Sequence, residues 1–192
     1  MEIGAGADAP VLVYFHGGGF RMASALAYRS FGSQLAKAIG GRVLLVDYRL
    51  APENPFPAAA DDAETAYRWL IAQGTDPGKV VVAGDSAGGG LTASLALRTL
   101  AQGPVPAALI CSSPVTDLTN SGATYDTNAE SDKLWSRTSA EEVVDLARHV
   151  ETSRVGAMGG HRAAVAAPVV ADDVVALGEG LHAHLPVRRH LL

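Results

Sequence analysis

Cysteine is nearly absent from this sequence, because Cys111 is the only one among 192 residues. A single thiol cannot form an internal disulfide, and no Cys/His cluster with metal-ligand spacing is present, so we expect no metal. Runs of 18 apolar residues are also missing, and so no membrane-spanning helix is expected. The first ten residues lack the basic and apolar segments of a secretion signal. We therefore expect a cytoplasmic protein.

Positive charge is scarce as well. Fifteen Lys and Arg residues stand against twenty Asp and Glu, a formal net charge of −5. This balance offers no basic surface for a phosphate backbone, so nucleic acid is not an expected partner. Hydrophobic residues make up 48% of the chain, which is enough for one globular domain with a sizeable core. Composition does not determine the oligomeric state.

Short apolar runs alternate with stretches of helical periodicity. We predict four buried strands at residues 11–15, 43–46, 80–83 and 107–111. Helices are predicted at 28–39, from about 58 to a stop at Gly74, at 87–100 and at 140–149. The helix at 28–39 is expected to bury Phe31, Leu35, Ala38 and Ile39, and the helix at 140–149 to begin with a capping box of Ser139 and Glu142. This alternation predicts an α/β fold, in which helices cover both faces of a parallel sheet.

A G-x-S-x-G pattern, Gly84-Asp85-Ser86-Ala87-Gly88, lies between a predicted strand and a predicted helix. In isolation it is better interpreted as a glycine-rich helix entry with a serine cap, because the pentapeptide often occurs by chance. In this context it matches a nucleophile elbow, where a sharp turn exposes a serine hydroxyl at a helix N-terminus. The two glycines would remove side chains that collide where strand and helix cross.

A second glycine-rich segment, His16-Gly17-Gly18-Gly19-Phe20, follows the first predicted strand directly. It fits neither phosphate-binding glycine pattern. Bare backbone amides in such a loop suit an oxyanion hole, since N–H donors have to point inward without obstruction.

The third motif is a proline-stiffened loop, Asp47-Tyr48-Arg49-Leu50-Ala51-Pro52-Glu53, continuing to Ala59. Its charged side chains are able to pair with one another, and bracing of the site is a better interpretation than catalysis. Asp61 and Asp62 follow at the start of the next helix, where they are expected to complement the helix dipole.

Taken in order, H-G-G-G-F, D-Y-R-L-A-P-E-x-P-F-P-A-A and G-D-S-A-G-G resemble the hormone-sensitive-lipase family of esterases, over roughly residues 10–118. The resemblance implies an α/β-hydrolase fold and hydrolysis of short- or medium-chain carboxylic esters without metal or organic cofactor. It implies Ser86 as nucleophile and the amides of Gly18, Gly19 and Ala87 as oxyanion hole. The residues it implies in support are His16, Gly17, Gly84, Asp85, Gly88, Arg49 and Glu53.

The acid and base of the triad have no matching segment here. Family motifs resembling V-G-x-x-D-x-L and P-G-x-x-H-x-F are absent, and only ten residues precede the first strand. A serine without its base is a poor nucleophile. We therefore expect a domain truncated at both ends and without activity. The acids and histidines of the tail lack the strand-then-loop setting of a triad: Asp172, Asp173, His161, His182, His184 and His190.

The tail has an unusual composition. Every amino acid in residues 159–192 can be encoded by a codon that begins with G or C, whereas 47 of the first 158 residues have no such codon. We therefore divide the chain into a partial hydrolase domain, 1–150, and an atypical tail, 151–192. The hypothesis is that the tail is an out-of-frame translation, and the alternative is a natural Ala/Val-rich segment. Translation of the encoding DNA in the other two frames decides, because an out-of-frame tail predicts a D-x-L and then a P-G-x-x-H segment in one of them.

Two other interpretations remain open. A non-catalytic binding module is one, because the same fold serves plant gibberellin receptors, which resemble this family but lack a working triad. A fragment without a stable fold is the other, since four strands would leave hydrophobic edges exposed.

Overall fold

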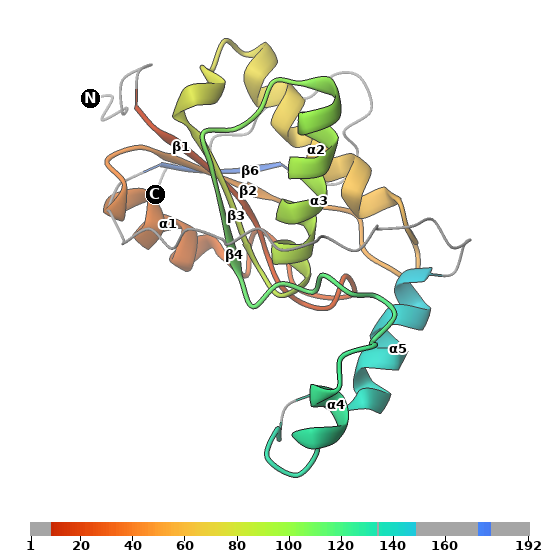
Figure 1. Ribbon diagram of the computed structural model, residues 1–192. Helices are drawn as coiled ribbons and strands as arrows, with labels where there is room; N and C mark the ends of the chain where they lie inside the picture. Colours follow the sequence, from red (N-terminus) through yellow and green to blue (C-terminus); the bar gives the residue numbers. More distant parts are fainter. Residues whose placement is uncertain (1–8, 134, 149–172, 178–192) are drawn as a thin grey trace.

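The computed structural model describes residues 9–133, 135–148 and 173–177. A parallel sheet lies at its centre, with strand order β4-β3-β1-β2-β6 (Figure 1). Each neighbouring pair of strands is parallel. The predicted α/β class is therefore confirmed. The strands are β1 (Val11–Phe15), β2 (Arg42–Val46), β3 (Val80–Asp85), β4 (Ala108–Ser112) and β6 (Asp173–Leu177).

Strand β6 was not predicted, and the expectation of four strands was wrong. It pairs with β2 in a register that runs from Arg42 opposite Asp173 to Val46 opposite Leu177. The segment D-V-V-A-L has the length and branched apolar content of a strand. Nothing local separates it from the other Ala/Val-rich residues of the tail, so only its pairing identifies it.

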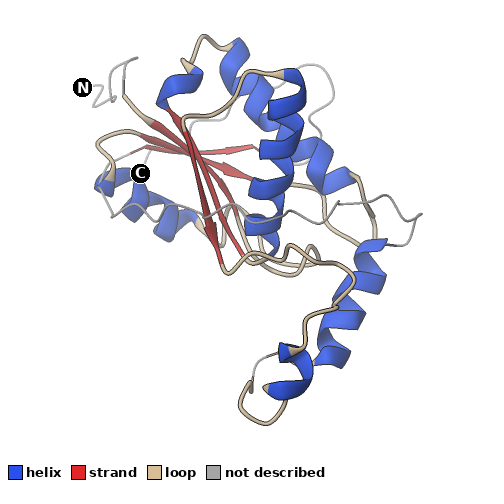
Figure 2. Cartoon of the chain, viewed as in Figure 1, coloured by secondary structure: helices blue, strands red, loops and turns tan. Residues whose placement is uncertain are grey.

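Helices cover both faces of the sheet (Figure 2). Helix α1 (Arg29–Ala38) lies against β2 and β6 on one face, whereas α2 (Ala58–Ala72) and α3 (Ala87–Gln102) pack together on the other. The remaining elements are the 3₁₀ turn η1 (Pro77–Lys79), the short α4 (Thr124–Thr127) and α5 (Arg137–Arg148).

This layering follows from the order of the strands. The chain leaves β1 for β2 through α1, then returns across β1 to β3 through α2. Right-handed crossovers that run in opposite directions place their helices on opposite faces. The loops after β1 and β3 consequently leave in opposite directions, which opens a crevice at the carboxyl ends of these strands. Phe15 and Gly84 are paired at that edge.

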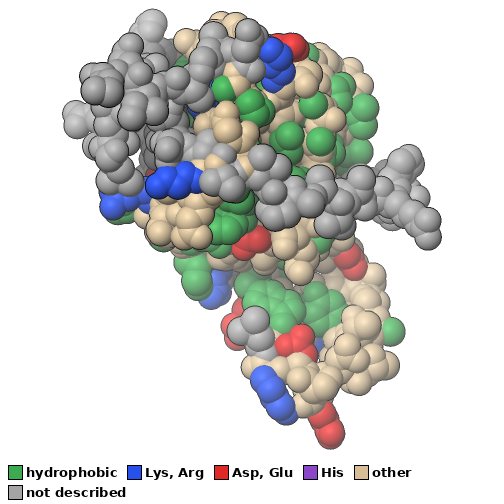
Figure 3. All heavy atoms as spheres, turned by 90° about the vertical axis from the view of Figure 1, so that its left-hand side faces the viewer, with side chains coloured by type: hydrophobic (Ala, Val, Ile, Leu, Met, Phe, Trp, Pro, Cys, Tyr) green, Lys and Arg blue, Asp and Glu red, His purple; other side chains and the backbone are tan. Residues whose placement is uncertain are grey.

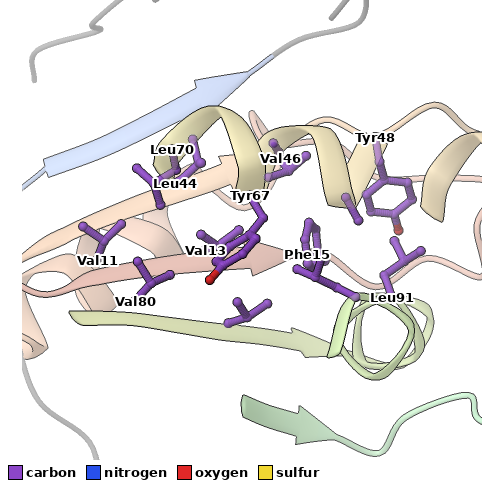
Figure 4. Close-up of a cluster of buried hydrophobic side chains, with 14 of the residues drawn as sticks. Val11, Val13, Phe15, Leu44, Val46, Tyr48, Tyr67, Leu70, Val80 and Leu91 are labelled. Atoms are coloured by element: carbon purple, nitrogen blue, oxygen red, sulfur yellow. The ribbon is translucent and has the colours of Figure 1, made fainter. Parts of the chain in front are cut away.

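The central strand is buried on both sides. Val11, Val13 and Phe15 of β1 contribute to the cluster beneath α2 and α3, shown in Figure 4. Leu12 and Tyr14, which alternate with them, contribute to the smaller cluster beneath α1. Burial on two faces explains why the strand appears in the sequence as a continuous apolar run.

The buried side of α1 agrees with the prediction only in part. Leu35 and Ile39 are partly buried against the smaller cluster, as predicted. The fully buried residues, however, are Gly32 and Ala36, and Phe31 is 45% exposed. A Cβ at Gly32 would lie 2.9 Å from a methyl carbon of Leu45, so the helix approaches the sheet along its small residues. The rings of Phe31 and Tyr14 instead form a T-shaped pair, with centroids 5.4 Å apart.

Helix α5 begins three residues earlier than predicted, and its cap is formed by another pair. The backbone N–H of Ser139 donates to Ser136 Oγ at 3.1 Å, and the N–H of Ser136 donates to Ser139 Oγ at 2.8 Å. This is a reciprocal capping box with serine in place of glutamate. Of the predicted end, His149 lies outside the described residues.

Tyr67 places its hydroxyl in the main core. Its ring extends from α2 over the strand that carries Val13 (Figure 4), and its buried oxygen makes no hydrogen bond to any described residue. An unsatisfied buried hydroxyl costs about 1–3 kcal/mol relative to a bonded one. We expect Tyr67→Phe to raise the free energy of unfolding by about 1 kcal/mol in thermal or urea denaturation.

Tyr48→Phe is the matched control for that substitution. The hydroxyl of Tyr48 is also buried but donates to the carbonyl oxygen of His16 at 2.7 Å. Its removal leaves that carbonyl without its donor and is expected to lower stability by about 1 kcal/mol. Equal effects of the two substitutions would contradict the assignment.

No helix in the described residues is long and apolar enough to cross a membrane. On the face shown in Figure 3, acidic and basic side chains are interspersed rather than gathered by sign.

Candidate active site

Ser86 forms the whole connection between β3 and α3. Its backbone has φ 51° and ψ −116°, a region that non-glycine residues rarely adopt. Such strain costs about 1–3 kcal/mol and persists only where the surroundings impose it. Here the N–H of Ser86 donates to the Ser112 carbonyl at 2.9 Å, and its own carbonyl accepts from Gly90 and Val115. The turn is therefore fixed by hydrogen bonds to α3, to the end of β4 and to the loop after β4.

Glycines on either side of Ser86 are required by close backbone approach. A Cβ at Gly84 would lie 2.3 Å from the Gly88 carbonyl oxygen, and a Cβ at Gly88 would lie 1.9 Å from the Phe15 carbonyl oxygen. Helix α3 thus begins in direct contact with the ends of both β1 and β3. The sequence predicted such a crossing at these two positions.

The glycine loop after β1 turns sharply beside this elbow. Gly18, Gly19 and Phe20 all have positive φ, at 120°, 61° and 61°. The carbonyl of Gly18 accepts from the amides of Arg21 and Met22, which closes the loop on itself. Within the described part of the chain, the amides of Gly18 and Gly19 donate no hydrogen bond. They are thus available to an anion, as is the amide of Ala87 in the first turn of α3.

Asp85 connects the elbow to the glycine loop. Its carboxylate accepts from the Gly17 amide at 2.9 Å, from the Tyr14 hydroxyl at 2.9 Å and from the Tyr28 hydroxyl at 3.1 Å. The resemblance implied a supporting role for Asp85 but did not identify its partners. Neither tyrosine stood out in the sequence, because each lies more than 50 positions from Asp85.

His16 lies inside the fold rather than in the crevice. It is 2% exposed, stacks on Tyr48 with ring centroids 4.4 Å apart, and has Nδ1 2.7 Å from the Gly17 carbonyl oxygen. Burial lowers the pKa of this imidazole, so it is neutral near pH 7 and Nδ1–H donates to that carbonyl. The side chain thus braces the glycine loop.

Arg49 pairs with Asp62, for which the sequence predicted an interaction with the helix dipole. Asp62 accepts from the Arg49 backbone amide at 2.8 Å and from its guanidinium through Nε and Nη2. Asp61 instead pairs with Arg98 of α3 at 2.7 Å. Both aspartates thus have specific partners that the sequence did not reveal. Asp61 also lies in the first turn of α2, where a carboxylate complements the helix dipole as predicted.

The two acidic residues of the proline-rich loop, Asp47 and Glu53, do not share the contacts of Arg49. Asp47 accepts from the backbone amide of Ala25, and the amide of Ala51 donates to the Phe20 carbonyl at 2.8 Å. These bonds attach the loop to the glycine segment. Glu53 is exposed and has no hydrogen bond or ion pair to another described residue, so its bracing role rests on the resemblance alone.

The structure brings Ser86, Asp85 and the glycine loop together at one edge of the sheet. Of the six histidines in the sequence, only His16 lies within the described residues. Of the tail candidates for a triad, only Asp173 lies there, at the start of β6. The described residues hold no group of three metal-ligating side chains.

Comparisons with known proteins agree with this geometry. The profile of a family described as having the alpha/beta hydrolase fold matches residues 12–177. An acetyl-hydrolase of Streptomyces hygroscopicus is 42% identical over 151 residues, which cover 78% of this chain and 48% of that protein. Esterase LipI of Mycobacterium tuberculosis is 46% identical over 104 residues, covering 52% and 32% of the two chains.

A solved structure is similar as well. The crystal structure of an esterase from the bacterial hormone-sensitive lipase family superposes with a TM-score of 0.71 at 41% identity. The match covers 76% of this chain and 50% of that one. The chain therefore spans about half the length of the relatives it matches.

Proposed function

Because the chain belongs to the α/β-hydrolase family of hormone-sensitive-lipase-type esterases, we propose that Ser86 is the nucleophile of a carboxylic-ester hydrolase site. The relatives are named acetyl-hydrolase and esterase, and the substrate class proposed here is accordingly a small carboxylic ester. No metal or organic cofactor enters this proposal.

The proposed reaction passes through an acyl-enzyme. Ser86 Oγ attacks the ester carbonyl carbon, and the carbonyl oxygen takes up negative charge facing the amides of Gly18, Gly19 and Ala87. Collapse of this intermediate breaks the bond to the alcohol, which leaves with the proton that Ser86 gave up. Water then attacks the acyl carbon and releases the carboxylic acid and free Ser86.

The observation that carries the proposal is the strained turn at Ser86 beside unbonded amides. A serine at φ 51° is strained, and the glycines beside it lie so close to backbone that an added Cβ would force the helix and the strands apart. This is a costly arrangement. A glycine-rich helix entry with a capping serine would need no such strain, and the side chain of Ser86 makes no cap hydrogen bond in α3. The geometry thus favours a nucleophile over a cap.

The rate of ester hydrolysis by this chain depends on a base that takes the proton of Ser86. His16 is neutral, buried and bonded to a carbonyl, so no described histidine serves as base for Ser86. We expect the 192-residue protein to hydrolyse p-nitrophenyl butyrate no faster than its Ser86→Ala variant. Release of p-nitrophenolate measured for both proteins tests this. A clear rate that depends on Ser86 would show that a base is supplied from outside the described residues.

A non-catalytic binding protein is the second candidate function. The lack of a base among the described residues favours it, whereas the strained elbow and the open amides favour an enzyme. A fluorophosphonate probe separates the two, since phosphonylation requires an activated serine. Labelling that is lost in Ser86→Ala supports the hydrolase, and an unlabelled protein that melts cooperatively supports the binding module.

A further inference from the structure

Tyr28 lies between the serine turn and the glycine loop, and the proposed reaction gives it no role. It immediately precedes α1, and its hydroxyl reaches both Asp85 of the elbow and Gly17 of the glycine loop. We propose that Tyr28 is a positioning residue, which holds the open amides of the glycine loop in place relative to Ser86. The inference rests on the proposed function only in that these amides bind an oxyanion.

The contacts form a closed triangle. The Tyr28 hydroxyl donates to Asp85 Oδ2 at 3.1 Å and accepts from the Gly17 amide at 3.3 Å, while the same amide donates to Asp85 Oδ1 at 2.9 Å. One hydroxyl therefore serves as donor to the elbow and as acceptor from the loop. Phenylalanine fills the same space but provides neither function.

The chemistry of Asp85 fits this arrangement. A carboxylate is an acceptor only, and here it meets three donors: the Gly17 amide and the hydroxyls of Tyr14 and Tyr28. Asparagine would direct an NH₂ group at one of them. Space is limited as well, because a Cβ at Gly17 would lie 2.2 Å from Asp85 Oδ2. The first glycine of the loop thus provides room for the carboxylate.

Both tyrosines remain donors at neutral pH. Burial, and then the negative charge of Asp85, raises the pKa of Tyr28, and the same two causes raise that of Tyr14. Neither hydroxyl ionises near pH 7, so the carboxylate keeps its donors.

The two tyrosines differ in what they connect. Tyr14 is part of β1, and among the described residues its hydroxyl bonds only to Asp85, whereas the Tyr28 hydroxyl bonds to both Asp85 and Gly17. The ring of Tyr28 is held by Tyr14 and by Phe31 of α1, with centroids 5.9 and 6.2 Å away. Tyr28 therefore ties the glycine loop to a helix as well as to the elbow.

The test measures anion binding without catalysis. In a Ser86→Ala background, ¹⁵N-labelled protein is titrated with butyrate, and the amide shifts of Gly18, Gly19 and Ala87 are followed. We expect saturable shifts, and a loss of affinity of about tenfold on adding Tyr28→Phe, with the melting temperature little changed. Tyr125→Phe is the matched control, since it removes a tyrosine hydrogen bond to Asn120 outside the site. It should leave the butyrate affinity unchanged.

Two results would overturn the inference. One is equal butyrate affinity in the Tyr28→Phe and Tyr125→Phe proteins, and the other is no shift of these amides in any variant. If Tyr28→Phe fails to fold, Asp85→Asn tests the same link, because it keeps the shape and loses an acceptor; it should weaken butyrate binding similarly. The proposed function is judged separately by fluorophosphonate labelling, which requires the Ser86 nucleophile that butyrate binding does not use.

Discussion

Replacing Gly88 with alanine is expected to lower the free energy of unfolding by about 4 kcal/mol or more, which is enough to prevent stable folding of a marginal domain. The added Cβ would lie 1.9 Å from the Phe15 carbonyl oxygen and 2.6 Å from that of His16. Both atoms belong to backbone, so relief requires α3 to move away from β1. That movement would also displace the Ser86 turn from the glycine loop.

Helix propensity alone predicts the opposite sign. Gly88 lies within α3, and alanine is favoured over glycine inside a helix by about 1 kcal/mol. Gly122→Ala provides the control, because the nearest atom to its added Cβ would be Thr124 Oγ1 at 3.6 Å, an ordinary contact. Urea denaturation of both variants, followed by circular dichroism, measures the difference. A Gly88→Ala protein as stable as Gly122→Ala would refute the close approach.

The second large effect is expected at Asp62. We predict that Asp62→Ala lowers stability by about 2–4 kcal/mol, since it leaves the partly buried Arg49 guanidinium without its carboxylate. The side chain of Asp62 is 10% exposed and that of Arg49 is 31% exposed, so water replaces only part of the interaction that the guanidinium loses. The backbone amide of Arg49 loses its acceptor at the same time.

The neighbouring aspartate supplies the comparison. Asp61 is 49% exposed in its side chain, and its partner Arg98 also bonds to Glu64. We expect Asp61→Ala to cost less than about 1 kcal/mol, as is usual for surface ion pairs. If both aspartates only complemented the helix dipole, the two substitutions would have equal, small effects. Chemical denaturation of the pair therefore distinguishes specific pairing from the dipole interpretation.

Loss of Asp62 is also expected to disturb the glycine loop of the candidate active site. The loop that Arg49 anchors continues to Ala51, whose amide donates to the carbonyl of Phe20 in the glycine segment. A loosened loop should therefore weaken butyrate binding in the Ser86→Ala background, whereas Asp61→Ala should leave it intact.

The sequence by itself determined the elements and the two glycine motifs. Apolar runs and helical periodicity predicted β1 to β4 and α1 to α3 to within a few residues, because such patterns record which side of each element is buried. The pattern around Ser86 identified the turn, since it places a residue without a side chain two positions before and two positions after the serine. These are local signals, and they persist in a chain that spans about half the length of its relatives.

Only the tertiary structure decided which residues meet across the fold. Asp85 bonds to Tyr14 and Tyr28, 71 and 57 positions away, because β1 and β3 are neighbours and α1 packs beside them. Asp62 and Asp61 are equivalent in sequence, yet they pair with different arginines because they occupy different sides of α2. Strand β6 likewise became visible only through its pairing with β2. Partners of this kind are set by strand order and helix packing, which bring together residues whose own segments carry no sign of one another.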